Sequence, residues 1–303
     1  MISENHDVWI AIPAALCAAL SYGSAGVLQH RATHQAPERP PLRPRLLLDL
    51  IGLRAFRSGA VLAALGFILQ VVALRFGPLT LVQPILVTGL LFYLGIASAM
   101  RKQWPDHWLL LGAVMTLMGL SGFLLAAEPK PGTGSLDSDD AFPLGLALAA
   151  AVAVCLAVSS RLGHEARTVP LAAATAVFYG VTAGLISSLV SVSSSDGGVI
   201  WQKWELYAVI VVGPMGFLLS QNAYQTGLYG SVALAIMTVG DPLVSIGIGV
   251  LWLDERIDTG AVSAALQGIA LTLMTAGVVV LAARAQSLAE RLQSGQVREA
   301  PPG

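Results

Sequence analysis

The chain has 303 residues, of which 55% are hydrophobic and only 12% are charged, and its net charge is −1. A soluble domain carries about 25% charged residues, so this chain has too little charge to face water on all sides, and lipid must contact much of it. The near-zero net charge argues against a nucleic-acid partner, which would call for a basic patch. Cys17 and Cys155 lie in apolar runs, which indicates packing residues and neither a disulfide nor a metal site.

Nine apolar runs approach the length of about 20 residues that a helix needs to cross a bilayer core. The first is expected to be retained, because the acidic N-terminus lacks the basic start of a cleaved signal peptide. We therefore expect an all-α integral membrane protein with about nine transmembrane helices. In chain order the runs are Val8–Gln29, Arg57–Arg75, Pro78–Met100, His107–Ala127, Phe142–Ser160, Pro170–Val192, Glu205–Gly227, Ser231–Leu253 and Gly260–Ala283.

The loops between these runs set the expected orientation and domains. Segment 31–56 is rich in Arg and Pro and its amphipathic part, 45–56, is expected to lie on the membrane surface. Basic loops face the cytoplasm, so this loop is expected inside, with the N-terminus outside and the C-terminus inside. The expected divisions are a first membrane repeat of four helices (1–127), an acidic external linker (128–141), a second repeat of five helices (142–283) and a cytoplasmic tail (284–303).

Two segments of the chain resemble each other. Segment 66–77 and segment 216–227 share a Gly, a Phe, a Leu, an Ala and a Gly in register. The expected topology carries the first segment outward and the second inward, which predicts an inverted repeat, the architecture of many secondary transporters. Chance similarity between two Gly-rich apolar helices is the alternative.

Asp241 is the one ionisable residue at the middle of an expected span. A carboxylate there costs about 3 kcal/mol on insertion scales, which predicts a proton or cation site. The alternative is a neutral Asp that caps the backbone freed by Pro242. Gln83 and Pro84 stand in the corresponding span of the first half, so a Pro-broken helix is expected in each half, as at transport sites, with a simple packing kink as the alternative.

Other polar residues within the spans are candidates for the substrate path. Gln221 and Asn222 belong to the most polar stretch of any span, Gln70 is the matching residue of the first repeat copy, and Tyr22 gives the first span a polar face. Their amide and hydroxyl groups suit a hydrated cation or a polar organic solute. Hydrogen bonding between helices is the alternative role.

No feature of the sequence indicates an enzyme. It contains no Gly-rich phosphate loop with a Lys, no zinc-ligand cluster and no Ser/His/Asp set, and no cofactor is expected. The five His residues fall at span ends or in loops and are expected to be interfacial. They are His6, His30, His34, His107 and His164.

The stretch from Ala233 to Glu255, with its Asp241-Pro242 pair and apolar run, resembles the penultimate helix of the drug/metabolite transporter superfamily, EamA type, and segment 268–277 looks like that family's last helix. Segment 73–84, with Pro78 and Pro84 around Leu-Thr-Leu-Val, looks like the NIPA-type magnesium transporter branch. The resemblance covers most of the chain. It implies a secondary transporter of the cell membrane that works by alternating access.

Two substrate classes and one non-transport role follow as alternatives. We expect a small metabolite or drug-like solute, coupled to protons or cations through Asp241; a divalent cation such as Mg²⁺ is the runner-up, with Asp241 as its ligand. The third alternative is a membrane scaffold or accessory subunit. The expected partners are the solute or cation and the lipid bilayer, and a homodimer is left open.

Overall fold

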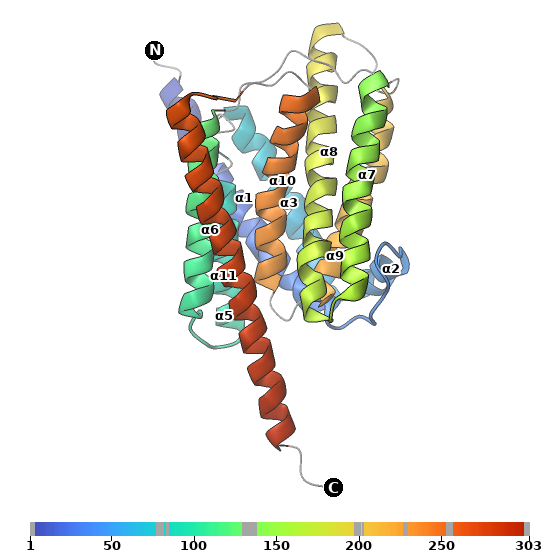
Figure 1. Cartoon of the computed structure of the whole chain (residues 1–303), viewed down its shortest axis with the longest axis vertical. Coiled ribbons are helices and arrows are strands. Elements are labelled where there is room, and N and C mark those ends of the chain that lie inside the picture. Colours follow the sequence, from blue (N-terminus) through green and yellow to red (C-terminus); the bar gives the residue numbers. More distant parts are fainter. Residues whose placement is uncertain are drawn as a thin grey trace.

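The computed structural model describes residues 4–76, 82, 85–128, 138–196, 201, 203–226, 230–252 and 257–299. These residues form ten α-helices and one short 3₁₀ helix (Figure 1). In chain order they are α1 (Glu4–Thr33), α2 (Arg45–Ile51), α3 (Arg54–Phe76), α5 (Gly89–Met100), α6 (His107–Ala127), α7 (Ser138–Arg161), η1 (Glu165–Arg167), α8 (Thr168–Asp196), α9 (Trp204–Thr226), α10 (Gly230–Trp252) and α11 (Ala261–Glu299).

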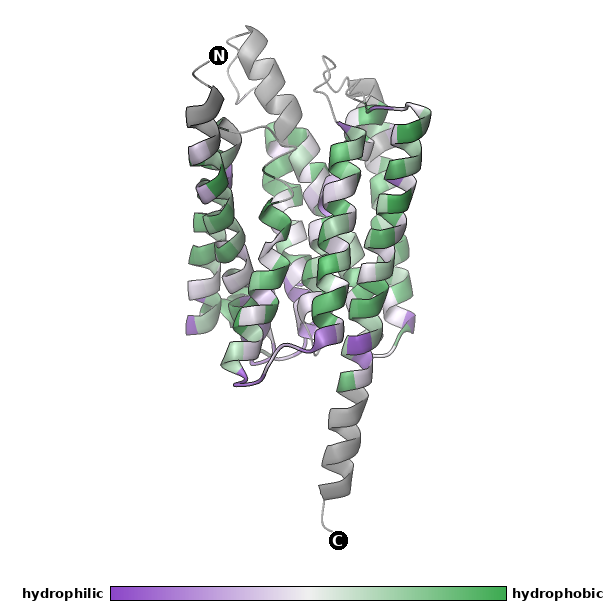
Figure 2. Ribbon diagram, turned by 90° about the vertical axis from the view of Figure 1, so that its left-hand side faces the viewer, coloured by the Kyte–Doolittle hydropathy of each residue, from purple (hydrophilic) through white to green (hydrophobic). Residues whose placement is uncertain are grey.

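Seven of the described helices, α1, α3, α6, α8, α9, α10 and α11, are long and apolar enough to cross a membrane, and two shorter apolar helices cover 85–100 and 145–161. Large apolar side chains such as Phe67, Val154 and Leu251 are exposed on the outside of the bundle, and green apolar ribbon covers most of the height of the helices (Figure 2). Lipid is the only solvent that favours such a surface. The chain is a multi-pass α-helical membrane protein, as its composition predicts.

Successive helices alternate in direction (Figure 1). Helices α1, α5, α7, α9 and α11 run downward in this view, and α3, α6, α8 and α10 run upward. The lower end carries Arg39, Arg101, Arg167 and Arg284 in or next to its connections, and we call it the basic end.

Glycines allow the helix backbones to approach closely. A Cβ on Gly119 of α6 would lie 2.5 Å from the backbone nitrogen of Met274 on α11, and one on Gly277 would lie 2.6 Å from that of Thr116. Such contacts between small residues replace the hydrophobic effect, which does not drive helix association within lipid. Helices α6 and α11 are therefore paired along a continuous glycine seam.

Helix α2 packs on the bundle at the basic end. Leu46 and Leu50 are fully buried, in a cluster with Ala32, Phe56 and Leu218, while Leu48 on the opposite face is exposed. The amphipathic pattern of 45–56 is thus explained by contact with α1, α3 and α9 as well as by any contact with the membrane surface.

One local expectation differs from the structure. Helix α10 is continuous through Pro242, so the expected helix break is absent there; the proline removes one backbone hydrogen bond without ending the helix. Helix α11 continues to Glu299, so the expected tail begins as an extension of the last membrane helix.

Candidate functional site

Asp241 is the twelfth of the 23 residues of α10, and its side chain is half-buried. A Cβ on Gly180 of α8 would lie 2.9 Å from the Asp241 carbonyl oxygen, so α8 and α10 touch at this level. The carboxylate is within electrostatic range of Tyr22 on α1 and Tyr179 on α8. A carboxyl at the middle of α10 therefore has two phenol groups from different helices near it.

Tyr22 also connects α1 to α3. Its hydroxyl donates a hydrogen bond to Gln70 Oε1 over 2.7 Å. Its ring lies against Gly66, where a Cβ would be 3.0 Å from the ring carbons. The structure therefore brings Tyr22, Gln70 and Asp241 into one region.

Tyr179 makes the equivalent contacts between α8 and α9. Its ring lies 3.1 Å from the position of a Cβ on Gly216, and its hydroxyl reaches the Ser220 side chain. Gly216 and Ser220 are four residues apart, like Gly66 and Gln70. Sequence reasoning missed Tyr179; the recurring Tyr-Gly pair at 22–23 and 179–180 is the signal that could have found it.

Gln221 joins the two halves of the chain near the basic end. Its Nε2 donates to Gln29 Oε1 of α1 over 3.1 Å and to the neighbouring Ser220 Oγ over 3.0 Å. Gln221 is fully buried, and its Oε1 has no partner among the described residues. An amide pair buried between α1 and α9 fixes these helices against each other, because separating it in apolar surroundings leaves polar groups unpaired.

Asn222, expected on the substrate path, binds the loop that follows α1. Its Oδ1 accepts from the Leu42 backbone N–H over 3.3 Å, and its Nδ2 donates to the Arg39 carbonyl over 3.4 Å. One turn later, Gln225 Nε2 donates to the carbonyls of Thr33, Ala36 and Pro37, and its Oε1 accepts from the Arg39 N–H. These two amides clamp the loop that follows α1 onto α9, and we call this contact the loop clamp.

Gln83 and Pro84 lie outside the described residues, so the expected counterpart of Asp241 in the first half is not placed. Among the residues that are described, no group of three or more His, Cys, Asp and Glu side chains is arranged to hold a metal ion. Asp241, the expected cation ligand, therefore belongs to no such group of three or more in that part of the chain.

No family model matches the chain, and no solved structure matches it. The chain is similar to an uncharacterized protein of Corynebacterium glutamicum, with 26% identity over 274 residues. The similarity covers 90% of this chain and 94% of the relative. The two proteins therefore resemble each other over nearly their whole length.

Proposed function

We propose that this protein is a secondary transporter of the drug/metabolite transporter superfamily, EamA-like, which moves a small metabolite or drug-like solute across the cell membrane by alternating access. The observation that carries the proposal is the place of Asp241, at mid-span in α10 and within electrostatic range of Tyr22 and Tyr179. An intramembrane carboxyl is costly and marks an ion or proton path by default.

The matched tyrosine contacts support two inverted repeats. Tyr22 packs on Gly66 and Tyr179 packs on Gly216, each with a polar partner one turn further along the second helix. The helices of the first set run opposite to those of the second (Figure 1). We therefore equate α1, α3, α5 and α6 with α8, α9, α10 and α11, which leaves α7 as the extra helix of a nine-span protein with the N-terminus outside.

In this scheme Asp241 binds the coupling proton or cation, and Tyr22 and Gln70 line the path. The Gln29–Gln221 pair and the loop clamp close the basic end, which faces the cytoplasm. They have to open once in each cycle for solute to pass. Gln221 and Asn222 then act on access to the path, in addition to any contact with the solute.

The test is transport by purified protein in proteoliposomes, with a panel of organic solutes and Mg²⁺, with and without a pH gradient. Asp241→Asn keeps the size of the side chain but cannot change charge. We expect this variant to fold and to lose gradient-driven accumulation while it retains some exchange. Asp258→Asn, at an exposed position outside the spans, is the matched control and is expected to behave as wild type.

Full, pH-dependent accumulation by Asp241→Asn would show that the carboxylate is structural and would remove the coupling mechanism. Accumulation of Mg²⁺ alone would favour the divalent-cation alternative. A wild-type protein that moves none of the panel in either direction would favour the scaffold or accessory role.

A further inference from the structure

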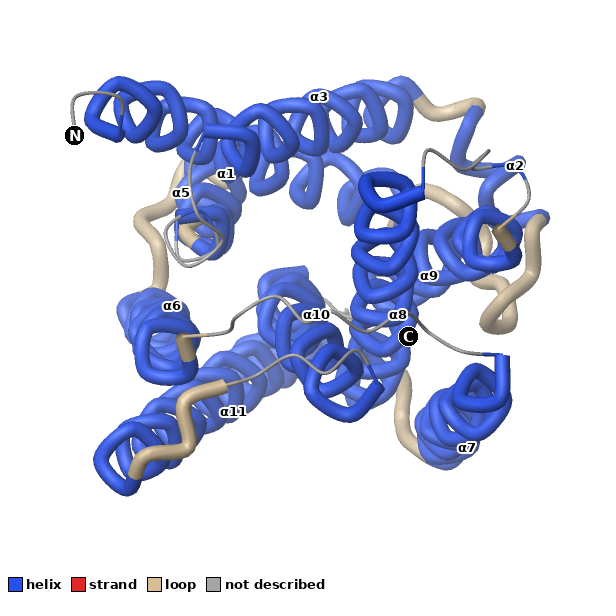
Figure 3. The backbone as a smooth tube through the Cα atoms, turned by 90° about the horizontal axis from the view of Figure 1, so that it is seen from above, coloured by secondary structure: helices blue, strands red, loops and turns tan. Residues whose placement is uncertain are grey.

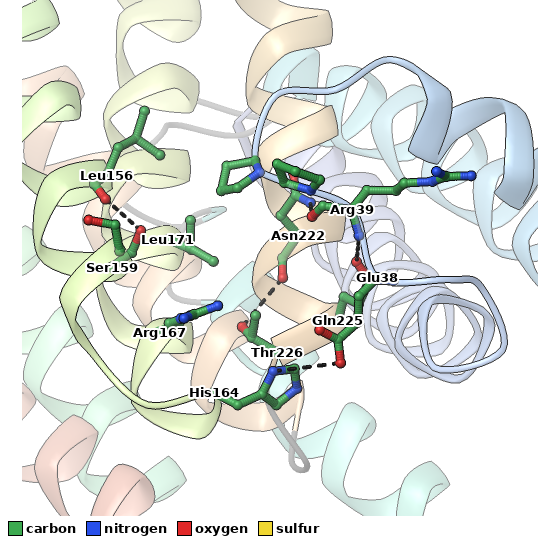
Figure 4. Close-up of a pocket in the computed structure, with 13 residues that line it drawn as sticks. Glu38, Arg39, Leu156, Ser159, His164, Arg167, Leu171, Asn222, Gln225 and Thr226 are labelled. Carbon is green, nitrogen blue, oxygen red and sulfur yellow. Dashed lines mark hydrogen bonds and ion pairs between the residues drawn. The ribbon is translucent and has the colours of Figure 1, made fainter.

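A cavity of about 600 Å³ opens at the basic end, between α7, α8, α9 and the loop after α1 (Figure 4). The apolar part of the lining consists of Pro40, Pro41, Leu156 and Leu171. The rest of the lining is polar and includes Glu38, His164 and Arg167, together with the Asn222 and Gln225 side chains of the loop clamp.

Two basic side chains of the lining already lie beside carboxylates. His164 Nδ1 lies 3.8 Å from Glu38 Oε1, which is an ion pair only when the imidazole is protonated. Arg39 Nε donates to Asp49 Oδ2 over 2.9 Å, and Figure 4 shows this side chain turned away from the cavity. These two pairs leave Arg167 as the remaining cation of the lining.

Arg167 is held by one atom only. Its Nε donates to the Leu162 carbonyl over 3.0 Å, which fixes the side chain between α7 and α8. Its two terminal amino groups have no partner among the described residues, and Figure 4 shows the guanidinium directed into the cavity. A half-buried guanidinium thus presents its two terminal NH2 groups to the cavity in a fixed orientation.

The neighbouring hydroxyls do not compete with Arg167 as donors. Ser159 Oγ donates to the Leu156 carbonyl and Ser160 Oγ to the Ala157 carbonyl. Thr226 Oγ1 is within hydrogen-bond distance of the Asn222 and Ala223 carbonyls. An anion in the cavity would therefore be bound first by Arg167.

We propose that this cavity is a binding site for a phosphate-bearing anion, with the phosphate on Arg167 and an apolar part of the same molecule against the proline and leucine side chains of the lining. The planar guanidinium matches two oxygens of a phosphate. Basic cavities between membrane helices near the headgroup level bind lipid headgroups, and a soluble phosphate ester offers the same chemistry. The proposal does not depend on transport.

The test uses the full-length protein purified in detergent. Native mass spectrometry with phosphatidylglycerol or phosphatidylcholine measures retained lipid, and thermal unfolding with inorganic phosphate or glycerol 3-phosphate measures binding of soluble anions. Arg167→Gln removes the charge. Arg167→Lys keeps the charge but loses the planar guanidinium that can bind two phosphate oxygens at once. Arg161→Gln, an exposed arginine on the same connection that does not line the cavity, is the matched control.

We expect the wild type and Arg161→Gln to retain phosphatidylglycerol in preference to phosphatidylcholine, and Arg167→Gln to bind about ten- to a hundredfold more weakly, since it loses charge-assisted hydrogen bonds. Arg167→Lys is expected to fall between them. Stabilisation of the wild type by glycerol 3-phosphate, with the same dependence on Arg167 and no lipid preference, would assign the site to a soluble ester.

Three results would overturn the proposal. The first is a wild-type protein that prefers neither phosphatidylglycerol nor a soluble phosphate. The second is equal loss of binding in Arg161→Gln and Arg167→Lys. The third is an Arg167→Gln variant that folds and binds like the wild type. The first result is measured on the wild-type protein alone, so the proposal can be overturned even if Arg167→Gln misfolds.

Discussion

The guanidinium of Arg284, on α11, binds the carboxylate of Asp106: the Nε–H is shared between both carboxylate oxygens, each at 3.1 Å, and Nη2 donates to Oδ2 over 2.7 Å. Asp106 also accepts from the backbone N–H groups of Trp108 and Leu109 and so caps the start of α6. One carboxylate therefore joins two helices that belong to different halves of the chain.

This pair predicts a pH-dependent stability. The hydrogen bond from Arg284 lowers the pKa of Asp106 below its usual range. A carboxyl with a lowered pKa contributes stability above its unfolded-state pKa, about 3.9, and the contribution is lost as the pH falls through the lower folded-state value. Asp106→Asn keeps a capping side chain but loses the ion pair. We expect it to lower the melting temperature of detergent-solubilised protein near neutral pH, and the difference from wild type to shrink in acid. A difference that grows as the pH falls would contradict this account.

The glycine seam predicts opposite effects at neighbouring positions of α6. A Cβ on Gly119 would lie 2.5 Å from the Met274 backbone nitrogen, whereas one on Gly122 would lie at an ordinary 3.6 Å from the Ala270 Cβ. Gly119→Ala should destabilise the protein by about 1–3 kcal/mol through overpacking. Gly122→Ala should be neutral or stabilising by up to about 1 kcal/mol, because Ala favours the helix. Thermal unfolding followed by fluorescence-detection size-exclusion chromatography measures the stability of both variants. Equal effects of the two substitutions would mean that the seam is not close-packed.

The loop clamp predicts a protease-sensitive variant. Gln225→Ala removes the amide that binds the Thr33, Ala36 and Pro37 carbonyls. A loss of about 1 kcal/mol in local stability raises the fraction of molecules in which the loop is detached from α9 about fivefold. A glutamate-specific protease should therefore cut faster after the exposed Glu38, as seen on gels. Gln35→Ala, at an exposed position beside the clamp, is the control, and unchanged cleavage of Gln225→Ala would show that the loop is held by other contacts.

The orientation predicts the sidedness of two loops. With Cys17 and Cys155 replaced by Ala, Gln103→Cys at the basic end should react with a membrane-impermeant maleimide only after permeabilisation. Thr259→Cys, between α10 and α11 at the other end, should react in intact cells. Labelling of both positions from the same side would refute the nine-span arrangement. Reversed labelling would mean that the basic end faces outward and the N-terminus faces the cytoplasm.

Much of the fold could be predicted because lipid demands long apolar helices, and their length is visible in the sequence. The mid-span place of Asp241 also follows from local patterns, whereas the hydrogen bond of Tyr22 to Gln70 does not, because it joins residues 48 positions apart. The loop clamp could not be predicted, because it depends on which face of α9 meets a loop far away in the chain. His30 was expected at the membrane interface, yet it is buried with ring centroids 6.4 Å from Tyr93 and 6.2 Å from Tyr224; a single histidine at a helix end carries no sequence signal for such packing.

The close contact of α6 with α11 restricts how the molecule can change shape. Each half of the chain contributes one of these helices, and their backbones lie in close contact at Gly112, Gly119 and Gly277. Seen from above, the pair stands at one corner of the bundle, away from α8 and α9 (Figure 3). Sliding one helix along the other would drive Cβ atoms into the opposite backbone, so this seam holds α6 and α11 in a fixed register.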